Sequence, residues 1–392
     1  MRIYLDHNAT TPVRDEVVDA MTRVLREDHG NPSSVHEEGG RARALVEEAR
    51  AQVASLLGAQ PREVIFTSGA TEANNTALLC AARASGRGRH VVSSNVEHPS
   101  VEAPLDALEA EGWRITRLAV DANGLLTPEQ VAEAIADDTA MVSLLWANNE
   151  TGILQPLREI AAAVAARGVP LHVDATQAVG KLEIDLDALP IDLVALSAHK
   201  FGGPKGSGCL LVRGRALRAR LDEAGAAAFE PLLRGGGQEG RLRGGTENVA
   251  GIVGLGVACA LAEAELPGRG RRYAALRDRL WRGIEEKVPD VRRNGPPDAV
   301  LPNTLNVSFA RTAGELLLQA LDLEGIAVSS GAACASGSIE PSRVLLAMGL
   351  TPDEARGTLR LSVGHGLDEA AIDRVIDLLP GLVARVRAAE PV

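Results

Sequence analysis

The sequence predicts an α/β fold with a large domain, built on a mostly parallel sheet of seven strands, and a smaller α+β domain after it. Short apolar runs alternate with Ala-rich amphipathic segments from about residue 15 to residue 212. A Gly- and Arg-rich segment follows at 229–245, and then a pattern of strand, helix, strand and helix. Alternating strands and helices are typical of a parallel sheet with helices on both faces. We expect the large domain to cover residues 15–258, and the small domain to combine 1–14 with 259–392.

The strands of the large sheet are expected at 64–67, 90–93, 114–120, 140–146, 171–173, 193–197 and 209–212. Helical segments lie between most of them, at 39–57, 72–84, 128–135 and 157–166. In such sheets, ligands bind beyond the carboxyl ends of the strands. The loops that follow these strands are therefore where we expect the chemistry.

The second half of the chain begins with the segment 229–245, which is either a glycine-rich linker or a loop that closes over an anion. One long helix or two are expected at 246–288. The small domain then has strands at 304–309 and 358–363 and helices at 315–321 and 368–386.

Composition and charge restrict the function. The chain has 41 Lys and Arg against 52 Asp and Glu, a formal charge of −11, which argues against broad binding to nucleic acid or anionic membranes. A local basic patch around Arg213, Arg215, Arg218 and Arg220 is the exception, although a solvated helix face explains it as well. The longest apolar run, 249–262, is too short to span a membrane and holds three glycines, so we expect a buried helix packed closely through them.

The four cysteines form no Cys-x-x-Cys pair, so neither a zinc site nor a disulfide framework is expected. The first residues run into charge and Pro12 before any apolar stretch could form a signal peptide. The predicted location is the cytoplasm, with no metal in the resting protein.

Lys200 follows the predicted strand 193–197, at the end of the stretch Ser197-Ala198-His199-Lys200. A buried lysine at such a place is costly unless it has a task. One such task is to form a Schiff base, because desolvation lowers the pKa of an amine and makes it nucleophilic. Ser197 and His199 are spaced so that they can bind a phosphate together. A surface lysine just past a strand is the simpler alternative.

Asp174 ends the strand 171–173, and Gln177 follows it. A carboxylate that pairs with a pyridine nitrogen keeps the ring protonated and makes it an electron sink, and Gln177 could bond the ring's phenolic oxygen. Asp174 could equally cap a helix.

A third strand, 64–67, leads through Ser68 and Gly69 into a helix that begins near Ala70 and Thr71. Free N–H groups at a helix start bind phosphate well, although Thr71 and Glu72 also suit plain caps. Each signal is weak alone. Together, a strand with an acid, a strand with a lysine and a strand–Gly–helix turn are far more specific.

At this point the chain resembles the class V aminotransferase family of fold-type I pyridoxal-phosphate enzymes, and within it the cysteine desulfurases of nitrogen fixation and iron–sulfur cluster assembly. The resemblance covers nearly the whole chain. It runs from Tyr4 to Ser362. The matching stretches are 4–12, 30–34, 96–99, 146–152, 243–248 and 360–362.

The resemblance implies a role for each matching residue. Lys200 would hold pyridoxal 5'-phosphate as a Schiff base and move the α-proton of the substrate. Asp174 would pair with the ring nitrogen, and Gln177 and Asn149 would contact the ring oxygen. His98 would stack on the ring and act catalytically as a shuttle for the thiol proton. Further roles are implied for phosphate binding at Ala70, Thr71, Ser197 and His199, for the partner subunit's phosphate at Thr246 in a homodimer, and for the substrate carboxylate at Asn149 and Arg360.

The remaining implied residue is Cys334, in a stretch of small residues that suits an exposed loop of the small domain. The implied reaction converts L-cysteine to L-alanine and leaves the sulfur on Cys334 as a persulfide, for delivery to an acceptor such as an iron–sulfur scaffold. Cys334 could also ligate a cluster in transit. The other cysteines, Cys80, Cys209 and Cys259, are expected in the core.

Departures from the family pattern fall at Ala332 and Ala335, where hydroxyl residues are usual, and at Ala198, Gln238 and His365. They put the rate in question rather than the reaction. Three alternatives remain: a selenocysteine lyase, an aminotransferase, and a non-catalytic partner within a sulfur-transfer complex. The last predicts loss of the cofactor residues, all of which are present.

Overall fold

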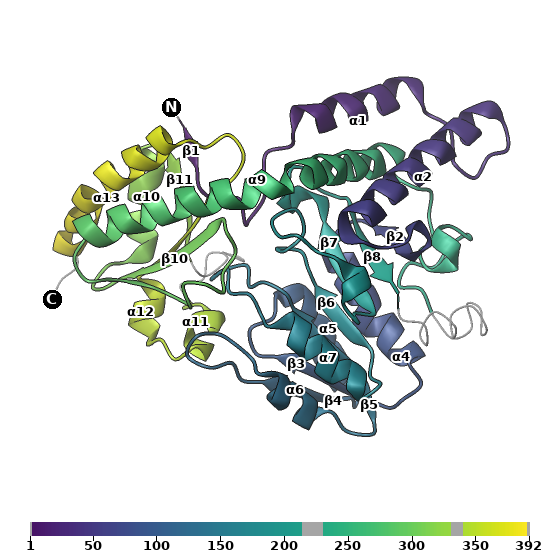
Figure 1. The fold of residues 1–392 in the computed structure, drawn as a ribbon, viewed down its shortest axis with the longest axis horizontal. Helices are drawn as coiled ribbons and strands as arrows, with labels where there is room; N and C mark the ends of the chain where they lie inside the picture. Colours follow the sequence, from purple (N-terminus) through teal and green to yellow (C-terminus); the bar gives the residue numbers. More distant parts are fainter. Residues whose placement is uncertain (1, 214–229, 331–339, 390–392) are drawn as a thin grey trace.

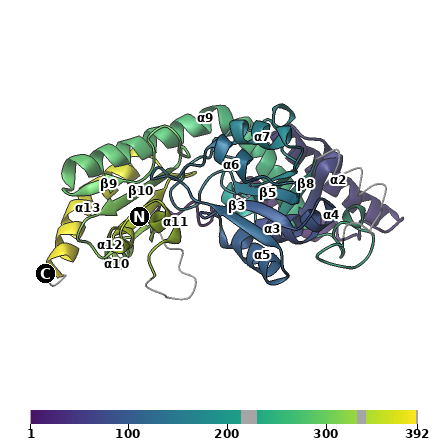
Figure 2. The ribbon, with the colours of Figure 1, turned by 90° about the horizontal axis from the view of Figure 1, so that it is seen from below.

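The computed structural model describes residues 2–213, 230–330 and 340–389. It has two parts that lie side by side, joined along one edge by a single long helix (Figures 1 and 2). The larger part holds the predicted seven-stranded sheet.

The strands of the large sheet follow the order β2-β8-β7-β6-β5-β3-β4. All pair in parallel except β8, which is antiparallel to both neighbours. Every residue of β5, β6 and β7 is buried, as expected for strands covered on both faces. This confirms the predicted fold class. The bounds are β2 (Val64–Thr67), β3 (His90–Ser94), β4 (Arg114–Leu118), β5 (Thr139–Leu145), β6 (Leu171–Asp174), β7 (Leu193–Ser197) and β8 (Gly208–Val212).

Helices surround this sheet, and the four predicted ones lie close to their expected positions, whereas α1 (Asp15–Glu27) and α5 (Pro99–Ala110) were not predicted. The expected helix at 72–84 is a continuous helical stretch in three parts, α3 (Ala70–Asn75), a π-helical turn (Thr76–Ala81) and α4 (Ala82–Ala84). The others are α2 (Glu37–Leu57), α6 (Pro128–Ala134) and α7 (Leu157–Ala166).

The smaller part is an antiparallel sheet in the order β12-β13-β10-β9 with helices beside it. The N-terminus joins this part, because β1 (Ile3–Tyr4) pairs in parallel with β11 (Ile326–Ala327). The other bounds are β9 (Val291–Arg293), β10 (Thr304–Phe309), β12 (Ser329–Ser330), β13 (Thr358–Ser362), α10 (Gly314–Leu323), α11 (Arg343–Ala347), α12 (Pro352–Arg356) and α13 (Glu369–Ala389).

The segment predicted as one helix or two is the single helix α9 (Val249–Lys287). Its length and apolar composition would suffice to cross a membrane, but it is mostly buried as a core helix of this protein. A Cβ atom at Gly256 would lie 2.7 Å from the Cα of Ala49 on α2, so glycine does allow the expected close packing.

The two ends of α9 belong to different cores. Residues from Ile252 to Leu266 pack into the core of the large sheet, and Leu276, Leu280 and Ile284 pack into that of the small one. The predicted boundary after residue 258 falls inside this helix, and the division into domains stays a prediction.

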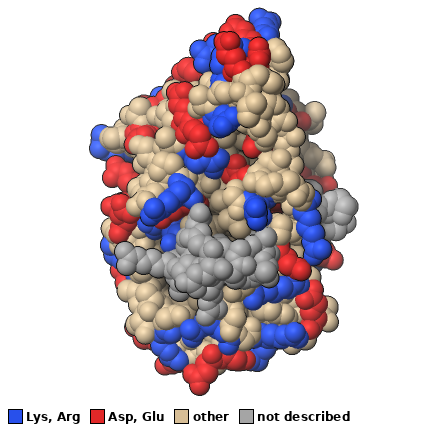
Figure 3. Space-filling model, turned by 90° about the vertical axis from the view of Figure 1, so that its right-hand side faces the viewer, with Lys and Arg blue, Asp and Glu red and all other residues tan. Residues whose placement is uncertain are grey.

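Charged side chains of both signs are mixed on the face shown in Figure 3, where Lys and Arg lie among Asp and Glu. Arg213, from the suspected basic patch, forms ion pairs with Glu63 and Asp187, whereas Arg215, Arg218 and Arg220 lie outside the described residues.

Candidate active site

A cavity of about 630 Å³ opens at the carboxyl ends of β6 and β7, between the two parts of the protein. Its wall includes residues from both parts, among them Asn8 near the N-terminus and Ser329 on β12. Ten of the residues that the sequence singles out line it: Ala70, Thr71, His98, Asn149, Asp174, Gln177, Ser197, His199, Lys200 and Arg360.

Lys200 follows β7 in a short 3₁₀ turn (Ala198–Lys200). Its Nζ atom donates hydrogen bonds of 2.8 Å to the carbonyl oxygens of Asn8 and Ala9. Burial and the charge of Arg360 lower the pKa of Lys200 to about 8, although Asp174 and Asp6 oppose this shift. An amine with this pKa is neutral more often near pH 7 than an ordinary lysine, as a nucleophile requires.

Asp174 ends β6 and is only 6% exposed. Its Oδ2 atom accepts a hydrogen bond of 2.8 Å from Nδ2 of Asn74 on α3, and its Oδ1 atom accepts one of 3.0 Å from the Thr176 amide. These donors fix the direction of the carboxylate.

A chain of polar contacts connects Asp174 with His98. Asn74 also donates to Oγ of Ser100 at 2.9 Å, and that hydroxyl lies 2.8 Å from Nδ1 of His98. The Ser100 amide donates to the same Nδ1 atom at 3.1 Å, so Nδ1 is the acceptor and the neutral ring carries its proton on Nε2. The sequence analysis missed Asn74 and Ser100. The local sequence marks Asn74 only by its position one turn inside a helix, and Ser100 only by its position two residues after His98.

The phosphate-binding candidates also line the cavity. Gly69 has a φ of 148° and precedes α3, whose first turn holds Ala70 and Thr71. The first N–H groups of a helix have no partner within it and suit an anion. Ser197 lies opposite, since its Oγ atom is 3.4 Å from where a Cβ on Gly69 would stand. His199 is held by a contact of 3.1 Å between its Nδ1 and Oγ1 of Thr10.

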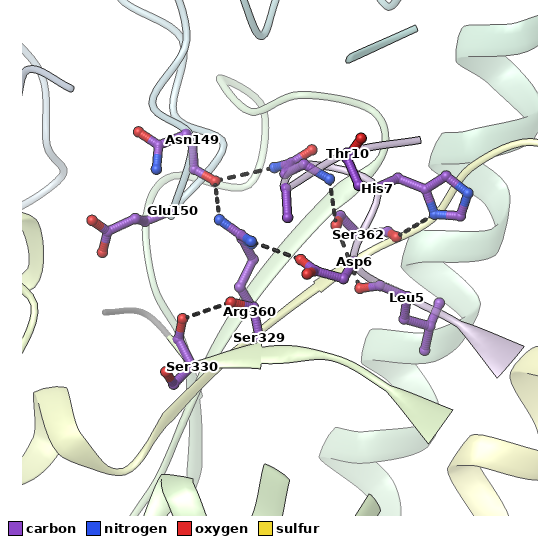
Figure 4. A network of polar contacts seen from close by, with 12 residues as sticks. Leu5, Asp6, His7, Thr10, Asn149, Glu150, Ser329, Ser330, Arg360 and Ser362 are labelled. Atoms are coloured by element: carbon purple, nitrogen blue, oxygen red, sulfur yellow. Dashed lines mark hydrogen bonds and ion pairs between the residues drawn. The ribbon is translucent and has the colours of Figure 1, made fainter. Parts of the chain in front are cut away.

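Arg360, on β13, faces the cavity from the small sheet (Figure 4). Its side chain is 4% exposed and forms an ion pair of 2.7 Å with Asp6. It also donates to the Asn149 carbonyl oxygen at 2.9 Å. Its buried Nε atom has no partner among the described residues. A guanidinium held in this way is suited to a carboxylate ligand, and Asp6 is a further residue that the sequence analysis missed.

Thr246, another predicted site residue, is exposed and does not line this cavity. Cys334 lies outside the described residues. Cys80, Cys209 and Cys259 are buried, as expected, and burial raises the pKa of each thiol.

The Gly- and Arg-rich segment is packed on the protein, against the interpretation as a free linker. Glu239 forms a bidentate pair with Arg50 of α2 at 2.9 and 3.0 Å and accepts from the Phe66 amide of β2. Arg243 reaches Glu72, beside the cavity, at 3.0 Å.

The residues present fit pyridoxal phosphate. One cavity holds an amine of lowered pKa, a fixed carboxylate, and hydroxyl and N–H donors at a helix start. The fold and site together define a fold-type I pyridoxal-phosphate enzyme.

Comparisons with known proteins identify the family. Residues 3–375 match the family Aminotransferase class-V. The chain is 42% identical over 390 residues to "Cysteine desulfurase IscS" of Dictyoglomus turgidum (99% of this chain, 96% of that one) and 44% identical over 390 residues to "Cysteine desulfurase" of Enterobacter agglomerans (99% and 94%). The solved structure of a "NIFS-LIKE PROTEIN" is similar with a TM-score of 0.89, at 35% identity over 98% of this chain and all of that one. The chain belongs to the class-V aminotransferase family, among its cysteine desulfurases.

Proposed function

We propose that this protein converts L-cysteine to L-alanine and transfers the sulfur atom to its own Cys334. The observation that carries the proposal is the convergence of Lys200, Asp174 and Arg360 on one cavity whose wall also includes Ser329. Ser329 lies five positions before Cys334 in the chain.

The chain's own residues divide the work. Arg360 and Asn149 bind the substrate carboxylate, and Asp174 keeps the pyridine ring protonated. When bound, pyridoxal phosphate supplies the electron sink. Lys200 removes the α-proton and later returns a proton to carbon, and His98 stacks on the ring.

The sulfur step balances without a further reactant. The Cys334 thiolate attacks the substrate sulfur, an S–S bond forms and the substrate C–S bond breaks. The products are alanine and a Cys334 persulfide. Cys334 is the nucleophile because the other cysteines are buried with raised pKa values.

The proposal extends to partners and location. The exposed Thr246 suits contact with the partner subunit's cofactor in a homodimer. Gln238 accepts from the Gly245 amide at 3.0 Å and so holds the residue before Thr246. The persulfide requires an acceptor protein, such as an iron–sulfur scaffold, and we place the reaction in the cytoplasm.

The test is product analysis with L-cysteine. Wild-type protein should form alanine, and Cys334→Ser should keep the visible absorbance of bound cofactor but lose at least about 100-fold in alanine formation. Cys80→Ser is the control and should keep the wild-type rate per folded molecule. Alanine formation by Cys334→Ser at the wild-type rate would instead support a lyase that needs no protein thiol, and amino-group transfer to a keto acid would support an aminotransferase.

A further inference from the structure

We propose that Lys181 is a positioning residue, which fixes Gln177 and the N-terminal segment against which Lys200 lies. The inference rests on the proposed roles of Lys200 and Gln177 but not on that of Cys334. Lys181 stands in the turn that follows β6, seven positions after Asp174.

Lys181 is a buried amine whose hydrogen bonds, within the part of the chain that the structure describes, go to two amide oxygens. It is 5% exposed, and its Nζ atom lies 2.6 Å from Oε1 of Gln177 and 3.1 Å from Oδ1 of Asn8. Within residues 2–213, 230–330 and 340–389, no carboxylate forms an ion pair with it. Burial, with the charges of Lys200 and Arg360, lowers its pKa well below the ordinary value. A buried amine without a counter-ion is costly in free energy, which indicates that Lys181 has a function in this protein.

The contact with Lys181 determines which way the Gln177 amide faces. A lysine amine held between two amide oxygens donates to both, so the oxygen of Gln177 must face Lys181. Its Nε2 atom is then the end directed toward Lys200, where it donates to the Asn8 carbonyl oxygen at 2.9 Å. Lys200 donates to this same oxygen at 2.8 Å. Lys181 therefore presents an N–H donor, rather than a carbonyl, beside Lys200.

Lys181 also holds the side chain of Asn8, which joins the two parts of the protein. The Oδ1 atom of Asn8 accepts from Asn303 at 3.0 Å as well, and its Nδ2 atom donates to Thr304 Oγ1 at 2.8 Å and to the Asn149 carbonyl at 3.2 Å. The carbonyls of Asn8 and Ala9 that bind Lys200 are thus fixed from several sides.

The sequence around Lys181 places its amine next to the active-site cavity but not in the wall of that cavity. Gly180 has a φ of 74°, and a Cβ atom there would lie 2.5 Å from Cβ of Phe201, the residue after Lys200. Only glycine permits this approach. Lys181 lines a second cavity of about 330 Å³, which Lys200 also borders, and it is not among the residues that line the first cavity. It acts through Gln177 and Asn8 rather than on the substrate.

The experiment is a pH titration of the visible absorbance of the bound cofactor in full-length variants. Lys181→Met removes the amine and releases the Gln177 amide, so less hydrogen bonding reaches the ring oxygen. We expect the pKa of the absorbance transition to rise by about one unit and cofactor affinity to fall about tenfold. Lys287→Met, which removes an exposed amine paired with Asp377, is the control and should match wild type.

A double-variant cycle distinguishes positioning from a general structural effect. In a Gln177→Leu background, adding Lys181→Met should change the pKa of the transition by less than about 0.3 units, because the amide through which Lys181 acts is gone. Equal shifts in both backgrounds, or a wild-type titration in Lys181→Met, would overturn the inference. If Lys181→Met does not fold, Lys181→Gln is titrated in the same way, with the same outcomes.

The wild-type titration also separates the proposed role of Lys200 from that of Lys181. If wild-type protein shows no visible absorbance with pyridoxal phosphate, the proposed role of Lys200 fails. If wild type titrates normally and Lys181→Met titrates in the same way, only the role of Lys181 fails.

Discussion

At the scale of single residues, the chemistry depends on where the fold buries charge. Lys200 and Arg360 are cations that share one cavity, and the anionic groups Asp174 and Asp6 face them. The pKa of Lys200, lowered to about 8, is the net result. This shift makes two predictions about pH in the cofactor-free protein.

The rate at which cofactor-free protein binds pyridoxal phosphate should rise with pH and level off above about pH 8, because only the neutral amine of Lys200 is nucleophilic. Stopped-flow absorbance measures this rate. The free energy of unfolding should also rise with pH. The folded protein loses the Lys200 proton at lower pH than the unfolded chain does, so burial of this amine lowers the free energy of unfolding below about pH 8. This cost fades as the pH rises toward the ordinary lysine pKa. A binding rate that does not change between about pH 6 and pH 9 would show that Lys200 is not the titrating group.

Lys200 and Asp174 could be predicted from the sequence because each ends an apolar strand, and strand ends meet at one edge of a parallel sheet. The role of Asn8 could not be predicted, because its partners Asn303 and Lys181 lie far away in the chain. Gln177 is only four positions before Lys181, but the spacing alone does not show that both side chains are buried and face Asn8.

At the scale of elements, α3 carries the support for the site as well as its phosphate end. Asn74 lies one turn inside α3 and connects Asp174 to Ser100, at the start of α5. The helix start and the carboxylate are therefore held by the same short element.

Asn74→Ala should leave Oδ2 of Asp174 and Oγ of Ser100 without this donor. We expect a loss of about 1–3 kcal/mol in the free energy of unfolding, measured with urea, and weaker binding of the cofactor. Asn75→Ala is the matched control, since that neighbour donates to the exposed Thr71 carbonyl of the same helix and to no other of the described residues. It should cost less than about 1 kcal/mol. Equal losses for the two variants would remove Asn74 from the account of the site.

The elements of the large sheet could be predicted well because their strands are continuous apolar runs. The strands β1, β9, β11 and β12 have two or three residues each and carry too little periodicity to recognise. The π-helical turn at Thr76–Ala81 has no signal in a helical pattern either. Pro267 leaves α9 unbroken, because the helix is held at both ends by two cores.

At the scale of the whole molecule, the active site depends on parts of the chain that lie far apart. The N-terminal segment, the large sheet and β13 each contribute to one cavity (Figures 1 and 4). The exposed Thr246 lies outside it, and we assign this residue to the partner subunit's site.

Mixed subunits test this assignment. A heterodimer of Lys200→Ala and Thr246→Ala chains contains one site with both native residues. The purified heterodimer should therefore have up to about half of the wild-type activity, and an equal mixture after random subunit exchange about a quarter, as for sites shared between subunits. The two variants mixed under conditions that prevent subunit exchange provide the control. Absence of recovery in heterodimers confirmed by mass would place Thr246 at its own subunit's site or outside any site.

The central claim is that the sulfur of cysteine is transferred to Cys334, and peptide mass spectrometry tests it most directly. The protein is incubated with L-cysteine, alkylated and digested. We predict that the mass of one added sulfur atom appears on the Cys334 peptide and not on those of Cys80, Cys209 or Cys259, and that it does not appear in Lys200→Ala. Alanine formation with no added sulfur on Cys334 would contradict the account.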